Sequence, residues 1–121
     1  MASGRKKTKD EAITAQQPVI LPLIYEGNLG TKGAVVRVPP PINQARAIAI
    51  RQNDGNVVVC GPNKAANAVM ARDIEQAASG RWKRCKPHIN AGPNALPHYQ
   101  PDPRGQTIGH TFYETDTKHP L

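Results

Sequence analysis

Short apolar runs closed by proline or glycine predict a small β-sheet. Residues 56–60, Asn-Val-Val-Val-Cys, are mostly β-branched, which is typical of a strand buried on both faces, so we place them at the sheet centre. Residues 34–38 form a second strand candidate, which the triple proline at 39–41 should end because proline lacks a ladder donor. The apolar residues 18–25 contain two prolines and predict an extended or edge segment, followed by a glycine-rich loop at 27–33.

Helix signals mark two later segments. Asn43 is a suitable N-cap for 44–52, although alternating isoleucines inside this segment also fit a strand. The stronger signal spans 64–79, which follows a capping Asn63 and precedes Gly80. Apolar residues recur there at helical spacing, and we assign the opposite, polar face to Lys64, Arg72, Asp73 and Glu75.

The last third of the chain predicts two further strands separated by a long loop. Residues 81–86, Arg-Trp-Lys-Arg-Cys-Lys, predict a basic strand open to solvent or ligand. Residues 109–114 predict the last strand, with His110 and Phe112 on one face. Between them, 87–107 contain five prolines and predict an irregular loop of a length that is usually functional or disordered. The elements together predict an α+β fold, a small antiparallel sheet packed against one or two helices.

Length and charge bound the organisation and the partners. The 121 residues suit one compact domain, expected at 18–114 between a flexible basic tail or linker at 1–17 and a C-terminal tail at 115–121. A net charge of +7 favours an anionic partner such as nucleic acid, an acidic protein or a membrane surface. No apolar run approaches the roughly 20 residues that cross a bilayer, so no membrane span is expected.

Two cysteines, Cys60 and Cys85, are too few and too widely spaced for a disulfide framework or for a zinc site built from Cys-x-x-Cys pairs. A disulfide between them stays geometrically open, and two buried thiols are the expected state. Carboxylates do occur near histidines, but no His-Asp-Glu spacing is diagnostic of a metal ion. We therefore predict neither a metal nor another cofactor.

Histidines in polar and aromatic motifs are the candidate catalytic residues. Imidazole is the side chain whose unperturbed pKa lies near neutrality, so histidines are the natural general acid and base of a small protein. We expect His98 and His110 to form the catalytic pair, brought together when the long loop folds back over the last strand. His88 is a third candidate, whereas His119 in the tail is expected to be inert. A histidine alone is more often a hydrogen-bonded surface or core residue, but three of them in polar and aromatic motifs make a catalytic role equally consistent with the sequence.

A set of basic, aromatic and polar side chains is predicted to bind a polyanionic substrate. The cations would contact phosphates, the aromatic rings would stack on bases, and the remaining polar groups would position the substrate. Alternatively, the cations of the basic strand only discourage aggregation at a sheet edge. The predicted substrate-binding residues are Arg81, Trp82, Lys83, Arg84, Lys86, Lys64, Tyr99, Gln100, Thr111 and Tyr113.

Motifs over about half the chain resemble a known family. They are 57–63 (Val-Val-Val-Cys-Gly-Pro-Asn), 66–67 with 73–75 in the second helix, 91–100 (Ala-Gly-Pro-Asn-Ala-Leu-Pro-His-Tyr-Gln) and 109–114 (Gly-His-Thr-Phe-Tyr-Glu). In these motifs, the chain is similar to the C-terminal toxin domains of bacterial polymorphic toxins of the Rhs and contact-dependent inhibition type. Such domains are commonly nucleases, and the resemblance implies a ribonuclease architecture of the barnase, EndoU, colicin and RelE type.

The resemblance also implies a setting for this activity. It implies a secreted or delivered effector that acts on RNA in the cytoplasm of a target bacterium, with a larger delivery polypeptide upstream. It further implies a cognate immunity protein, and the positive charge predicts that this partner is acidic and covers the basic and histidine face. In the family pattern, His98 and His110 occupy the polar motif positions.

The sequence is therefore consistent with three functions. The first is an antibacterial toxin domain that acts as a metal-independent ribonuclease through histidine acid/base catalysis. The second is an ADP-ribosyltransferase toxin, in which Tyr99, Thr111, Tyr113 and Glu114 would serve a nicotinamide site. The third is a non-catalytic nucleic-acid-binding module in which the histidines only fold a loop.

Overall fold

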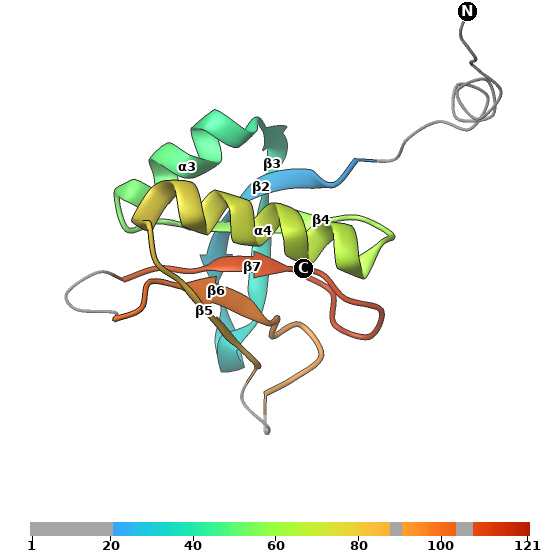
Figure 1. The fold of residues 1–121 in the computed structure, drawn as a ribbon. Coiled ribbons are helices and arrows are strands. Elements are labelled where there is room, and N and C mark those ends of the chain that lie inside the picture. Colours follow the sequence, from blue (N-terminus) through green and yellow to red (C-terminus); the bar gives the residue numbers. More distant parts are fainter. Residues whose placement is uncertain (1–20, 88–90, 104–107) are drawn as a thin grey trace, which may run out of the picture.

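A computed structural model describes residues 21–87, 91–103 and 108–121 of the chain. Over these residues, six strands form one mixed sheet, and two α-helices pack against it, so the predicted α+β class is confirmed (Figure 1). The tail expected at 1–17 and the candidate His88 lie outside the described residues.

The strands do not follow one another in space as they do in sequence. They lie in the order β3-β2-β4-β7-β6-β5, with β4 and β7 parallel and the other neighbours antiparallel. The expectation of a purely antiparallel sheet is therefore wrong at the central pair, because α4, β5 and β6 together supply the long crossover that a parallel pair needs. The elements are β2 (Leu23–Leu29), the 3-10 turn η1 (Thr31–Gly33), β3 (Val35–Ile42), α3 (Gln44–Gln52), β4 (Asn56–Cys60), α4 (Lys64–Ser79), β5 (Lys83–Cys85), β6 (His98–Gln100) and β7 (Thr111–Tyr113).

Local capping explains where both helices begin and where α4 ends, and the predicted bounds of both helices are confirmed. The Asn43 side-chain oxygen accepts a hydrogen bond from the Arg46 backbone N–H at 2.8 Å, and Asn63 caps α4 in the same way at 3.0 Å. Gly80 ends α4 in the left-handed conformation, with φ of 78°, which costs glycine little because it has no Cβ.

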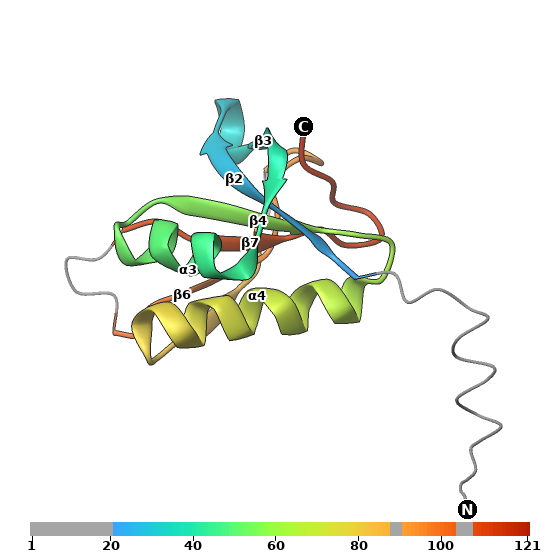
Figure 2. The same ribbon diagram turned by 90° about the horizontal axis from the view of Figure 1, so that it is seen from above.

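The helices lie on one face of the sheet, as the two perpendicular views show (Figures 1 and 2). Side chains alternate across each strand, so the sheet has a separate apolar cluster on each face. On the helix face, β4, β6 and β7 pack against α3 and α4 through Val57, Val59, Tyr99, Tyr113, Ala47, Ala71 and Ile74. On the opposite face, Val58, Cys60 and Phe112 pack against Val35 and Leu96, so the segment before β6 covers part of this face.

Two N-terminal predictions are wrong. The segment at 18–25 was expected to be an edge or extended piece, yet β2 (Leu23–Leu29) is an interior strand that pairs with β3 on one side and β4 on the other. The triple proline was expected to end its strand, yet β3 continues to Ile42. The register shows why: Glu26 pairs with Val38 and Ile24 with Ile42, so the prolines fall in a bulge where ladder pairing is interrupted.

The predicted irregular loop at 87–107 contains a strand. β6 (His98–Gln100) pairs with β5 on one side and β7 on the other. A strand of this length shows no readable alternation, and prolines on both sides of it predict a loop. The basic strand and the last strand do form as β5 and β7, each shorter than its predicted range.

The C-terminal residues lie against β3. The Leu121 backbone N–H donates to the Val35 carbonyl at 2.8 Å, and the Leu121 carbonyl accepts from the Arg37 N–H at 2.8 Å. These hydrogen bonds attach the end of the chain to the outer edge of the sheet.

Both cysteines are free thiols. Cys60 is buried, and burial together with the nearby Glu114 raises the pKa of its thiol to about 12, whereas Cys85 is half-buried. Within the described part of the chain, neither helix has the length and apolar character that a membrane span requires.

Candidate active site

His98 and His110 lie side by side on the sheet face opposite the helices. Their ring centroids are 4.6 Å apart, with the ring planes inclined at 72°. The predicted proximity of these imidazoles is confirmed, but the expected cause is wrong, because strand pairing between β6 and β7 brings them together rather than a loop that folds back. The catalytic role of the pair remains a prediction.

The strand register fixes this geometry. His98 lies directly opposite Phe112 in the β6–β7 pair, and His110 precedes Phe112 by two positions, so all three side chains share one face. The Phe112 ring contacts both imidazoles, at centroid distances of 5.3 Å from His98 and 5.1 Å from His110. Because Phe112 is itself buried, it forms a rigid apolar support for the two rings.

The two histidines line a cavity of about 590 Å³. This volume is in the range of small-molecule and nucleotide sites. Among the described residues, its walls come from the β2–β3 turn, the segment after β5, the segment before β6, and strands β6 and β7. The lining residues are Leu29, Lys32, Gly33, Lys86, Pro87, Ala91, Ala95, Leu96, His98, His110 and Phe112.

Besides the two histidines, two lysines line this largely apolar cavity and bring positive charge to it. Lys86 was predicted to bind substrate, whereas Lys32 was not identified from the sequence. Lys32 lies in η1 with a left-handed backbone, φ of 57°, which is uncommon outside glycine and asparagine. Its sequence neighbourhood indicates only a glycine-rich loop, and only the fold places it at the same cavity as the imidazoles.

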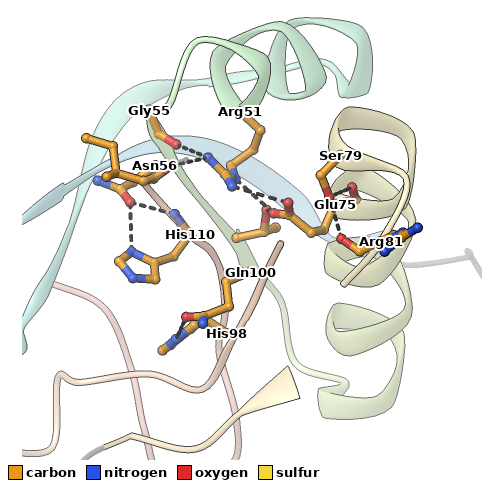
Figure 3. Close-up of polar contacts among 11 residues, drawn as sticks. Arg51, Gly55, Asn56, Glu75, Ser79, Arg81, His98, Gln100 and His110 are labelled. Atoms are coloured by element: carbon orange, nitrogen blue, oxygen red, sulfur yellow. Dashed lines mark hydrogen bonds and ion pairs between the residues drawn. The ribbon is translucent and has the colours of Figure 1, made fainter. Parts of the chain in front are cut away.

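Asn56 at the start of β4 orients His110 (Figure 3). The Asn56 Oδ1 atom accepts the His110 backbone N–H at 2.8 Å and lies 3.1 Å from the His110 Nδ1 atom. A backbone N–H can only donate, so this atom is the amide oxygen, and the ring nitrogen beside it must also donate. The proton of neutral His110 is therefore on Nδ1, which leaves the lone pair on Nε2 and suits this ring for the role of a general base.

Gln100 lies beside the other imidazole. Its Oε1 atom is 3.2 Å from His98 Nε2, and because an amide oxygen only accepts, this arrangement keeps a proton on Nε2. Gln100 was predicted to position substrate. In the structure it contacts His98, on the same face of β6 two positions away.

A buried ionic network holds the segment around His110, which leads into β7 (Figure 3). Arg51 of α3 and Glu75 of α4 form a bidentate pair, with Nε–Oε1 at 2.9 Å and Nη2–Oε2 at 3.2 Å. The Thr111 hydroxyl donates to Glu75 Oε1 at 2.8 Å, and Arg51 Nη1 also donates to the Ile108 carbonyl at 3.2 Å. The residues on both sides of His110 are thereby tied to the helices.

This network corrects two sequence-based assignments. Glu75 was placed on the polar face of α4, yet it is fully buried, because the Arg51 guanidinium compensates its charge inside the fold. Thr111 was predicted to contact substrate, yet its side chain is buried on the helix face. A side chain at that position cannot reach the cavity on the opposite face.

Gly109 is required by the same network. Its φ is +90°, and a Cβ there would lie 2.6 Å from Arg51 Nη1 and 2.6 Å from the Gly55 carbonyl oxygen. We therefore expect Gly109→Ala to lower the free energy of unfolding by about 1–3 kcal/mol. Urea denaturation measures this change. Gly92→Ala is the control, because nothing lies within 4 Å of a Cβ there, and equal stability losses in both variants would contradict the expectation.

A second cavity, of about 300 Å³, contains three of the five predicted substrate-binding cations. Lys64, Arg84 and Lys86 line it, together with Tyr113. Burial and the nearby Tyr99 raise the pKa of the Tyr113 hydroxyl, which therefore stays protonated at neutral pH.

The remaining predicted substrate-binding residues lie outside the two cavities. Tyr99 is only 5% exposed and packs between Trp82 and Tyr113, with centroid distances of 5.2 Å and 5.6 Å, so its ring is not open for stacking on a base. Trp82 is 37% exposed, and Arg81 and Lys83 are exposed on and beside β5.

Among the described residues, no three His, Cys, Asp or Glu side chains gather as a metal-binding group. Comparisons with protein-family models, with curated proteins and with solved structures found no match to this chain. The geometry of the cavity and the motifs of the sequence are therefore the two indications of function.

Proposed function

We propose that this chain is a metal-independent ribonuclease in which His110 acts as general base and His98 as general acid. The observation that carries the proposal is the pair of imidazoles 4.6 Å apart at a cavity that also contains Lys32 and Lys86. Such a cavity offers an acid, a base and cations to a phosphodiester, which are the groups that RNA cleavage requires.

The reaction follows from the protonation states. Neutral His110 accepts the proton of a ribose 2′-hydroxyl at Nε2, while Asn56 holds the Nδ1 proton. The 2′-oxygen attacks phosphorus, the bond from phosphorus to the 5′-oxygen breaks, and protonated His98 donates a proton to that leaving oxygen. The products are a 2′,3′-cyclic phosphate and a 5′-hydroxyl. Lys32 and Lys86 stabilise the charge on the phosphoryl oxygens.

The closeness of the two imidazole rings favours a pair that carries a single positive charge. Two positive imidazoliums at this separation repel each other, so the pair favours the state with a single positive charge. That state supplies one acid and one base at the same time. The apolar walls from Leu29, Leu96 and Phe112 lower the local polarity and strengthen the attraction of the lysines for phosphate.

The wider biological role is proposed from the motifs. The resemblance to polymorphic toxin domains supports a delivered antibacterial toxin with a ribonuclease architecture of the barnase, EndoU, colicin and RelE type. It would act in the target cytoplasm and be inhibited in the producer by an acidic immunity protein over the histidine cavity. The ADP-ribosyltransferase alternative receives less support, because Tyr99 and Thr111, which it would use, are 5% and 0% exposed.

Purified protein tests the reaction directly. In the presence of EDTA, we expect it to cleave an RNA oligonucleotide and to leave the same sequence with 2′-deoxyribose intact. Mass spectrometry of the fragments should find 2′,3′-cyclic phosphate ends, because the 2′-oxygen is the nucleophile. Cleavage of the deoxy strand, or loss of RNA cleavage in EDTA, would contradict the mechanism. Transfer of label from NAD to a target without RNA fragmentation would favour the transferase instead.

A further inference from the structure

The second cavity concentrates positive charge, and apart from Lys86, which lines both cavities, the proposed reaction does not use its cations. Its described lining contains four cations, Lys64, Arg84, Lys86 and Lys118, and no carboxylate. Lys64 is also the first residue of α4, a helix of 16 residues, so the partial positive charge of the helix end adds to the field. The site therefore combines side chains from α4, β5 and the C-terminal segment around a hollow.

Nearby acidic groups do not neutralise these cations. Glu114 precedes the lining residue Thr115, but its Oε1 accepts the Gly61 backbone N–H at 3.0 Å and its Oε2 lies 2.7 Å from His119 Nδ1. That hydrogen bond raises the pKa of His119, so the imidazole carries more positive charge than an isolated one. Both oxygens of the Glu114 carboxylate therefore contact groups other than the four cations of the cavity.

The cationic cavity adjoins the histidine cavity. Lys86 and Pro87 line both, and Pro97 of the cationic cavity directly precedes His98 of the other. We propose that the cationic cavity is a second phosphate subsite, which binds a phosphodiester next to the one at the histidines. This inference rests on the proposed function for the identity of the polyanion. A single-stranded RNA would pass over Lys86 from one cavity to the other.

Binding of uncleavable RNA tests the subsite. A 2′-O-methyl dinucleotide has one phosphodiester, and a tetranucleotide has additional ones, while neither offers a 2′-hydroxyl nucleophile. We expect the double substitution K64Q/R84Q to weaken tetranucleotide binding about tenfold and to leave dinucleotide binding within about twofold. The slope of log Kd against log salt should fall by about 1 to 1.5, since two phosphate contacts are lost. Nuclear magnetic resonance titration measures the dissociation constant of each of the two oligonucleotides.

The control variant R46Q/R72Q removes the same charge from exposed positions on α3 and α4. Equal weakening by both double variants, or no effect of K64Q/R84Q, would overturn the subsite. Because Arg84 lines the cavity beside the buried Tyr113, the single variant Lys64→Gln at an exposed helix end repeats the test without disturbing the fold. We expect a smaller loss of tetranucleotide affinity from it. Tetranucleotide binding that depends on Lys64 in a protein that leaves RNA intact would support the anion subsite and overturn the ribonuclease reaction alone.

Discussion

Replacing His110 with alanine lowers the rate of RNA cleavage by about 10²–10⁴-fold, the usual contribution of a general acid or base. The variant loses the Nε2 lone pair that accepts the 2′-hydroxyl proton, while the Asn56 side chain keeps its hydrogen bond to the His110 backbone N–H. The strand is thereby retained, and the loss should fall on kcat rather than on KM. Single-turnover cleavage of an RNA oligonucleotide measures it.

His98→Ala should lose a similar factor, and the double variant should lose little more than either single one, because acid and base act in the same step. Rate against pH should be bell-shaped for the intact protein, since one ring must be neutral and the other protonated. Each single variant should lose one limb of that bell. A pH profile that keeps both limbs in His110→Ala would contradict the assignment of this ring as the base.

His119→Ala provides the matched control. Its side chain is 55% exposed and contacts Glu114 rather than the cavity. We expect its cleavage rate to stay within about twofold of the intact protein, as for a surface change away from the site. If this variant lost as much activity as His110→Ala, histidine removal would be acting through something other than the catalytic pair.

Local signals explain how much of the fold was predictable. Asn43, Asn63 and Gly80 define helix ends through hydrogen bonds to residues a few positions away, and a sequence pattern records such contacts directly. β4 was predictable for a related reason, since a β-branched run buried on both faces has few alternatives.

Long-range pairing explains what the sequence did not predict. β6 is a strand only because β5 and β7 flank it, and the prolines of β3 fit only because they fall in a bulge. The pairing of Asn56 with His110 spans 54 positions, and an asparagine before a valine run indicates only a strand beginning. The candidate site therefore divides in the same way, with the histidines predictable as residue types and their partners Asn56 and Lys32 defined by the fold.

Replacing Glu75 with alanine should lower the free energy of unfolding by about 3–5 kcal/mol, because it leaves the Arg51 guanidinium buried without its counter-ion. Arg51 is 2% exposed and Glu75 is 0% exposed, so water cannot solvate the charge that remains. The substitution also removes the acceptor of the Thr111 hydroxyl, at 2.8 Å. A loss of this size is a large part of the 5–15 kcal/mol that stabilises a typical domain.

Asp73→Ala on the same helix is the matched control. Its pair with Arg72 is exposed, with side-chain exposures of 51% and 42%, and such surface pairs contribute about 0–1 kcal/mol. Urea denaturation of both variants measures the contrast between the two ion pairs. If Glu75→Ala fails to fold, the double variant R51M/E75L decides the question, because removing both charges should restore a cooperative transition. Equal stability of Glu75→Ala and Asp73→Ala would show that the buried pair does not hold the helices to the strand that presents His110.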